Sequence, residues 1–270
     1  MKLISSISIV TFVMLLSSIN LAAQSDDMFD KTSPYIGNWG VNYGVDGQDR
    51  GNCGGWAGES GEKLLNCQLP AHTLPLNARG KAWMEFTDHR MTPGLNDCAP
   101  GVIPSLLGDS GRWYLSGREN EIVIYYSDID WTRHVWMDGR KPPLQSHLFQ
   151  HGYSVGHWEG DDLVIVSTNY TFDPEGIDDH LHMASSVLKK VTERYHLMSD
   201  DMMRLTITID DPIFLTRPFT YALIEYKRQG GPNPGWLHCD PGASRREVEY
   251  GYPGNKYNLP AFPEEEYRTQ

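Results

Sequence analysis

Apolar and polar residues alternate along the second half of the chain with the period of two that is typical of β-strands. Short runs of turn-forming residues separate these stretches at even spacing. Consecutive hairpins of this kind predict an antiparallel meander, and seven or eight such strands close into a barrel or fold into a two-sheet sandwich. The expected strands cover residues 121–127, 132–137, 153–159, 162–168, 187–197, 202–209 and 219–228.

The clearest turn is Gly160-Asp161, two residues that accept a positive φ and therefore favour a tight two-residue hairpin. This turn predicts the register of the two flanking strands. In that register Tyr153 and His157 lie on one face of the hairpin together with valines, whereas Ser154 lies on the other face. Two ionisable side chains are therefore expected to share an apolar surface.

The remaining chain divides into segments with weaker patterns. Residues 24–270 are expected to form a single β-barrel domain, because a chain of this length is ordinary for one all-β domain. Its first part, 24–80, is rich in Gly and aromatic residues and is expected to be an irregular N-terminal wrap. Residues 81–88 predict a strand or a short helix, 97–111 a loop, and 230–270 a C-terminal tail rich in Pro, Gly and Tyr.

The N-terminus and the charge indicate an exported protein with an acidic surface. Residues 1–23 contain a Lys, an apolar run and small residues in the order of a secretory signal peptide, so a periplasmic or secreted protein is expected. The run is too short for a comfortable transmembrane span, so no membrane partner is expected after cleavage. The formal net charge of −12 repels phosphate backbones and disfavours nucleic acid as a partner.

Four cysteines in an exported chain favour two disulfides. We expect Cys53 to pair with Cys67 and Cys98 to pair with Cys239, although three connectivities are open. A zinc site is the alternative, but no CxxC and no paired His-Cys spacing supports it.

Five motifs occur along the chain in a fixed order: CAPG at 98–101, RHVWMDGR at 133–140, GYSVGHWEGD at 152–161, ERY at 193–195 and DP at 211–212. In these motifs the chain resembles a large group of exported, uncharacterised bacterial proteins. The resemblance implies a shared calycin-like (lipocalin-like) fold, and it implies no reaction. Many members carry His where this chain has Tyr153 and Arg where it has His157, and a change from His to Tyr moves the ordinary pKa from about 6.5 to about 10.

Histidines are concentrated in the strand-rich part of the chain. A meander would bring several of them into one mouth of the barrel, where His serves as acid, base or ligand near neutral pH. The alternative is that each is an exposed or interface histidine hydrogen-bonded to a neighbour. Seven of the ten histidines fall between 134 and 196: His134, His147, His151, His157, His180, His182 and His196.

Two further groups of polar residues have both a functional and a structural interpretation. His180 and His182 would point the same way on a strand and form a weak candidate metal site with nearby carboxylates, although no third ligand is identifiable. A second group either braces one end of the barrel through Arg-carboxylate pairs or anchors an anionic group of a substrate. This group contains Arg133, Asp138, Arg140, Glu193 and Arg194.

These patterns favour an exported enzyme that needs no cofactor and performs general acid–base catalysis, of lyase, isomerase, cyclase or hydratase type, on a small and largely apolar molecule. Apolar walls would shift the pKa values of its catalytic groups and exclude water. A non-catalytic periplasmic carrier of the lipocalin type is one alternative, and a metal-dependent hydrolase is another. The expected catalytic residues are Tyr153 and His157 with His134 or His182, and the expected substrate-binding residues are Arg133, Trp136, His151, Trp158 and Glu193.

Overall fold

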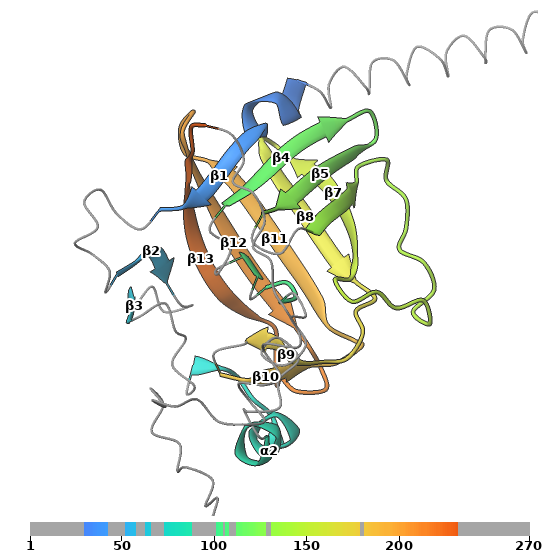
Figure 1. The fold of residues 1–270 in the computed structure, drawn as a ribbon. Coiled ribbons are helices and arrows are strands. Elements are labelled where there is room, and N and C mark those ends of the chain that lie inside the picture. The colour runs from blue at the N-terminus through green and yellow to red at the C-terminus, as the bar shows by residue number, and fades with distance from the viewer. Residues whose placement is uncertain are drawn as a thin grey trace, which may run out of the picture.

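The computed structural model describes residues 30–42, 52–57, 63–65, 73–87, 101–104, 106–107, 112–127, 131–178 and 181–231. Within these residues nine strands form one closed β-barrel, because the last strand of the sheet pairs with the first (Figure 1). The strands around the barrel are β1 (Gly37–Val41), β4 (Arg112–Arg118), β5 (Glu121–Tyr126), β6 (Trp131–Trp136), β7 (Tyr153–Glu159), β8 (Asp162–Thr168), β11 (Lys190–Leu197), β12 (Met202–Asp210) and β13 (Phe219–Arg228).

The predicted β-barrel is thereby confirmed, but its strands do not all run antiparallel. Strands β6 and β7 are parallel and share two residue pairs, Val135 with Ser154 and Trp136 with Val155. A closed ring with an odd number of strands cannot alternate direction throughout, so a ring of nine needs at least one parallel pair. Residues 137–152 make this possible, because they carry the chain from the end of β6 back to the opposite end of the barrel.

Smaller elements lie at the two ends of the barrel. The short helix η1 (Ser33–Tyr35) lies at the top of Figure 1, and α2 (Ala78–Phe86), β9 (Asp173–Asp178) and β10 (Met183–Ser185) lie at the bottom. We call these the η1 end and the α2 end. Strands β2 (Asn52–Ala57) and β3 (Lys63–Leu65) extend the sheet beside β13. No helix among the described residues is long and apolar enough to cross a membrane.

The structure settles several ambiguous parts of the sequence. The stretch predicted as a strand or a short helix is the helix α2, whose first backbone N–H groups donate to the side chain of Asn77 at 3.0 Å. Residues 37–41, within the predicted irregular wrap, form barrel strand β1. The predicted signal peptide, Cys67, Cys98, Cys239 and most of the C-terminal tail lie outside the described residues, as does the side chain of Cys53.

The barrel interior is filled largely by aromatic and aliphatic side chains. Trp113 contacts the rings of Trp39, Tyr195 and Tyr226, with centroids 5.2–6.4 Å apart, and all four are buried. At the η1 end the Tyr35 hydroxyl donates to the backbone oxygens of Asp161 and Tyr195. The helix η1 therefore closes this end of the barrel with a buried ring and two hydrogen bonds.

Gly156, on β7, permits close packing across the β6–β7 pair. A Cβ atom at this position would lie 2.4 Å from Met137 Sδ and 2.9 Å from Val135 Cγ1. We expect Gly156→Ala to lower the free energy of unfolding by about 1–3 kcal/mol, because overpacking forces neighbouring atoms to shift. Urea denaturation measures this, with Gly230→Ala as the control because a Cβ there meets nothing within 4 Å. Equal stability of the two variants would contradict the prediction.

Candidate functional site

The predicted acid–base pair, Tyr153 and His157, lies on the outer face of β7. The hairpin register is the one expected from its turn, with Tyr153 opposite Thr168 and His157 opposite Val164. Ser154 faces the interior, whereas the His157 side chain is 51% exposed and its Nε2 lies 3.1 Å from a carboxylate oxygen of Glu159. The predicted register is confirmed, but the face that carries these two residues points away from the barrel interior.

The other two predicted catalytic residues lie on different elements. His134 is on the outer face of β6, and its Nδ1 lies 2.8 Å from Glu121. His182 is in the turn between β9 and β10, and its Nδ1 lies 2.5 Å from Glu175. The four expected catalytic side chains thus occupy β6, β7 and the β9–β10 turn, each of the three histidines lies beside a carboxylate, and the structure does not bring the four together in one barrel mouth.

Only one of the two histidines of the weak candidate metal site lies within the described residues. His180 lies outside the described residues, and His182 is paired with Glu175. Among the side chains that the structure describes, no group of three His, Cys, Asp or Glu could hold a metal ion.

The barrel interior contains a polar cluster centred on Arg133. Its guanidinium forms a bidentate ion pair with Glu193, at 2.9 and 2.7 Å, and both side chains are buried. Two further N–H groups donate to the hydroxyls of Ser154 at 3.0 Å and Ser167 at 2.8 Å. The charged group therefore has partners on β7, β8 and β11, which is the condition under which a buried ion pair is tolerated.

Two tyrosines extend this cluster. The Tyr195 hydroxyl donates to Glu193 at 2.7 Å, and the Tyr126 hydroxyl accepts from Arg133 at 3.4 Å. Burial opposes the guanidinium charge, but Glu193 and Tyr126 offset this and hold the pKa of Arg133 well above its ordinary value. The sequence left two interpretations of the charged residues, bracing of the barrel or anchoring of a substrate anion, and Arg133 and Glu193 fit the bracing. Arg194 forms separate ion pairs with Glu159 and Asp162 on the surface.

Beside this satisfied cluster, His151 carries a buried nitrogen without a partner. Its ring stacks on Trp131 with centroids 3.8 Å apart, and Trp131 in turn stacks on Tyr126 at 5.3 Å. His151 Nδ1 is buried and forms no hydrogen bond with the described residues. Burial, with the charges of Arg133 and Lys189, lowers the pKa of His151 to about 4, so the imidazole is neutral at physiological pH.

Tyr170 carries a second buried polar group of this kind. Its side chain is fully buried under Gly152, where an added Cβ would lie 2.7 Å from the ring. The Tyr170 hydroxyl forms no hydrogen bond of good geometry with the described residues. The Ser167 hydroxyl acts on it and partly offsets the rise in pKa that burial causes. Burial raises the pKa of Tyr170 above its usual range, so this group is a neutral phenol.

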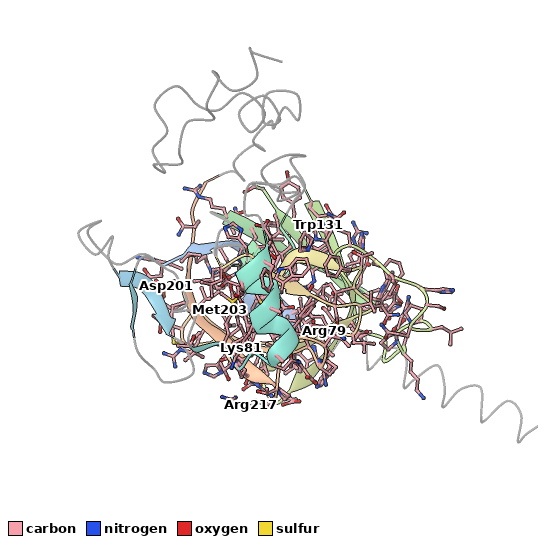
Figure 2. All side chains as sticks on the ribbon, turned by 90° about the horizontal axis from the view of Figure 1, so that it is seen from below. Arg79, Lys81, Trp131, Asp201, Met203 and Arg217 are labelled. Carbon is pink, nitrogen blue, oxygen red and sulfur yellow. The ribbon has the colours of Figure 1, made fainter. Side chains whose placement is uncertain are left out.

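Lys189 lies against the face of the Tyr170 ring, with Nζ 4.1 Å from the centroid. Its Nζ donates to the backbone oxygens of Ile103 at 2.9 Å and Gly176 at 2.7 Å. Burial lowers the pKa of Lys189 to about 7. His151, Tyr170 and Lys189 thus form a group of titratable side chains at the α2 end, next to Arg133. Figure 2 views the barrel from this end, with α2 crossing in front of it and Trp131 labelled.

The remaining predicted binding residues lie away from this group. The Trp136 ring is on the outer face, 3.9 Å from the Arg140 guanidinium, and Arg140 pairs with Asp138. Trp158 packs on Tyr35 at the η1 end, with centroids 5.4 Å apart. Of the five predicted substrate-binding residues, only Arg133, His151 and Glu193 lie at or beside the interior polar cluster.

Sequence reasoning missed Tyr170 and Lys189. Neither belongs to a motif: Tyr170 lies just beyond the predicted strand 162–168, and Lys189 lies inside the predicted strand 187–197, where the alternation gives it no special role. One signal was present for the serines of the cluster: the hairpin register pairs Ser154 with Ser167 across the face opposite to the valines. Two facing hydroxyls among apolar neighbours indicate a buried polar partner, which is Arg133.

No family model and no curated protein matches the chain. Among solved structures, the fluorescent protein UnaG N57A mutant aligns with 74% of this chain and 99% of its own, at 12% identity and a TM-score of 0.32. A likeness of this size carries no argument about function. The strand order of the described residues therefore defines the class of protein, which is a closed nine-stranded β-barrel with both parallel and antiparallel strand pairs. Its interior holds a buried polar cluster, and unpartnered polar groups lie at one end.

Proposed function

We propose that this protein binds a small, largely apolar molecule in the barrel at the α2 end, and that His151 and Tyr170 hydrogen-bond to it. One observation carries the proposal: among the described residues, His151 Nδ1 has no hydrogen-bond partner and the Tyr170 hydroxyl has no well-formed one, and both are buried at the same end, near Arg133 and Lys189. An unsatisfied buried polar group costs about 1–3 kcal/mol. A bound molecule that supplies the missing partners accounts for both groups.

Binding fits the geometry better than acid–base catalysis by the residues first expected. A substrate held between Tyr153 and His157 would lie on the outer face of β7, where the His157 side chain is 51% exposed. We therefore rank a non-catalytic carrier above a cofactor-independent lyase or isomerase. The pattern of residues 1–23 supports action in the periplasm or outside the cell.

Binding of an uncharged apolar dye with a carbonyl acceptor, Nile red, tests this site. We expect saturable binding by the full chain, and about tenfold weaker binding by His151→Ala and by Tyr170→Phe, because each loses about one hydrogen bond's worth of affinity. Fluorescence titration gives the dissociation constants. His157→Ala is the matched control, since its histidine lies on the outer face beside Glu159 and should leave binding unchanged.

Two results would overturn the proposal. The first is the absence of saturable binding. The second is equal binding by His151→Ala, Tyr170→Phe and His157→Ala. Native mass spectrometry of the protein purified from its own source, with elemental analysis, then identifies the retained molecule, and a stoichiometric metal would instead favour the metal-dependent alternative.

A further inference from the structure

A segment of the chain itself occupies the α2 end of the barrel. We call residues 101–104 and 106–107 the inner segment. The predicted loop here is buried, and its apolar side chains belong to the barrel core. Two barrel side chains hold its backbone: Lys189 donates to the Ile103 oxygen at 2.9 Å, and Tyr226 donates to the Leu107 oxygen at 2.6 Å. The buried apolar residues are Val102, Ile103, Leu106 and Leu107.

Lys189 lacks a negatively charged partner. Its Nζ is bound by two backbone carbonyls and the Tyr170 ring face, and it forms no ion pair among the described residues. Asp173 and Asp211 act on its charge without contacting it, and the buried Asp211 accepts hydrogen bonds from Ser186 and Ile213 instead. Buried ammonium groups are usually paired with an anion, because burial without one is costly. Lys189 is therefore a buried amine that no carboxylate of the described residues contacts.

We propose that the molecule bound at this end is an apolar carboxylic acid, whose carboxylate replaces the Ile103 carbonyl on Lys189 Nζ and whose apolar body replaces the buried side chains of the inner segment. This inference rests on the proposed function, since it names the ligand class of the same site. The inner segment presents one oxygen acceptor and a set of aliphatic side chains to the barrel. An apolar acid presents the same chemistry in one molecule.

The exchange is favourable at Lys189 because a carboxylate is a stronger partner than a carbonyl. Charge-assisted hydrogen bonds are roughly twice as strong as neutral ones, and a low dielectric strengthens the attraction further. The second carboxylate oxygen has two neutral donors nearby, the Tyr170 hydroxyl and, in its Nδ1–H tautomer, His151. One ligand would then supply partners to Lys189, Tyr170 and His151.

Competition with the inner segment has a measurable consequence. If ligand and segment exclude each other, the apparent dissociation constant is the intrinsic one divided by the fraction of molecules whose segment is displaced. Weakening the segment should therefore tighten binding. Leu107→Ala removes buried contacts of the segment while leaving Lys189, His151 and Tyr170 in place, and we expect it to bind the acid more tightly than the natural chain does.

Three probes with the same apolar chain test the ligand class: decanoic acid, decan-1-ol and decylamine. Isothermal titration calorimetry at pH 7 should give at least about tenfold tighter binding of the acid than of the alcohol, and the weakest binding for the amine, since one charge-assisted contact exceeds a neutral one by about this factor. In Lys189→Met we expect the preference for the acid to disappear while decanol binding stays. Lys190→Met, at the exposed neighbouring position, is the matched control and should keep the preference.

A second measurement covers the case in which Lys189→Met does not fold. Decanoate binding to the natural chain should be accompanied by proton uptake at pH 7.5, because the carboxylate stabilises the charged form of Lys189. The other titratable groups that act on Lys189 or lie beside it are Asp173, Asp211, Tyr170 and His151. Titrations in buffers of different ionisation enthalpy measure the uptake, and the absence of uptake contradicts the inference.

The outcomes separate this inference from the proposed function. If decanol binds and decanoate binds no more tightly, the ligand class is wrong and the binding site stands. If Lys189→Met keeps the preference for the acid, or Leu107→Ala binds it no more tightly, the role given to Lys189 or to the inner segment is wrong. If none of the three probes binds while Nile red does, this inference fails and the proposed function stands; if Nile red does not bind either, both fail.

Discussion

Glu193→Gln is expected to lower the free energy of unfolding by about 3–5 kcal/mol, one of the two largest effects that we predict. The substitution keeps the size of the side chain and removes its charge, so the buried guanidinium of Arg133 loses both carboxylate contacts. An unpaired buried charge is far more costly than an exposed one. Chemical denaturation of the full chain, monitored by tryptophan fluorescence, measures the change.

Two controls isolate the buried charge as the cause. Glu225→Gln breaks the exposed ion pair with Arg204 and should change stability by less than about 1 kcal/mol. The double variant Arg133→Met with Glu193→Leu removes both charges, and we expect it to regain most of the lost stability, because apolar replacement of a whole buried pair is often neutral or stabilising. A loss in Glu193→Gln no larger than that in Glu225→Gln would contradict the buried ion pair.

The stability of the protein should also rise with pH between about 6.5 and 9, by roughly 2–3 kcal/mol from Lys189 alone. In the folded state the pKa of Lys189 is lowered from 10.5 to about 7, mainly by burial. Above pH 7 the unfolded chain therefore binds a proton that the folded chain does not, and stability increases with pH until the unfolded lysine also loses its proton. Thermal or urea unfolding at several pH values measures this rise.

The source of this pH dependence can be tested with Lys189→Met, which should remove most of the rise. Three other shifted groups titrate outside this window in the folded state: His151 gains its proton only near pH 4, and the pKa values of Tyr35 and Tyr126 are raised to about 12. Lys190→Met, with its exposed side chain, should keep the natural pH profile. An unchanged slope in Lys189→Met would show that Lys189 titrates normally.

The sequence predicted the local parts of the fold well. The turn at Gly160-Asp161 determines a hairpin register that the structure confirms pair by pair. Strands with clean alternation, such as β8 and β13, have the predicted bounds. Two of the missed strands contain Gly or Pro: β1 contains Gly37 and Gly40, and β9 contains Pro174. These residues weaken the strand pattern, and long-range pairing compensates for them in the fold.

The candidate site could not be predicted to the same extent, because both faces of the hairpin are apolar. Val164, on the outer face, is 2% exposed, and Ile165, on the inner face, is 0% exposed. Period-two alternation assigns residues to faces but does not say which face is inside when both carry aliphatic side chains. Because Tyr153 and His157 share a face with valines, the pattern favoured these two residues as the catalytic pair. Lys189 is held against the Tyr170 ring by contacts with the backbone oxygens of 103 and 176, which no local pattern encodes.

The closure of the barrel between β1 and β13 has a consequence for how the protein is made. Trp39 pairs with Arg228, so the first and last strands of the ring meet across nearly the whole described chain. A growing chain on the ribosome cannot complete this seam until β13 has emerged, and until then β1 and β12 both present open hydrogen-bonding edges. Such edges recruit other strands and promote aggregation. A chain that ends before β13 therefore keeps two open strand edges and should be more prone to aggregation than the closed barrel.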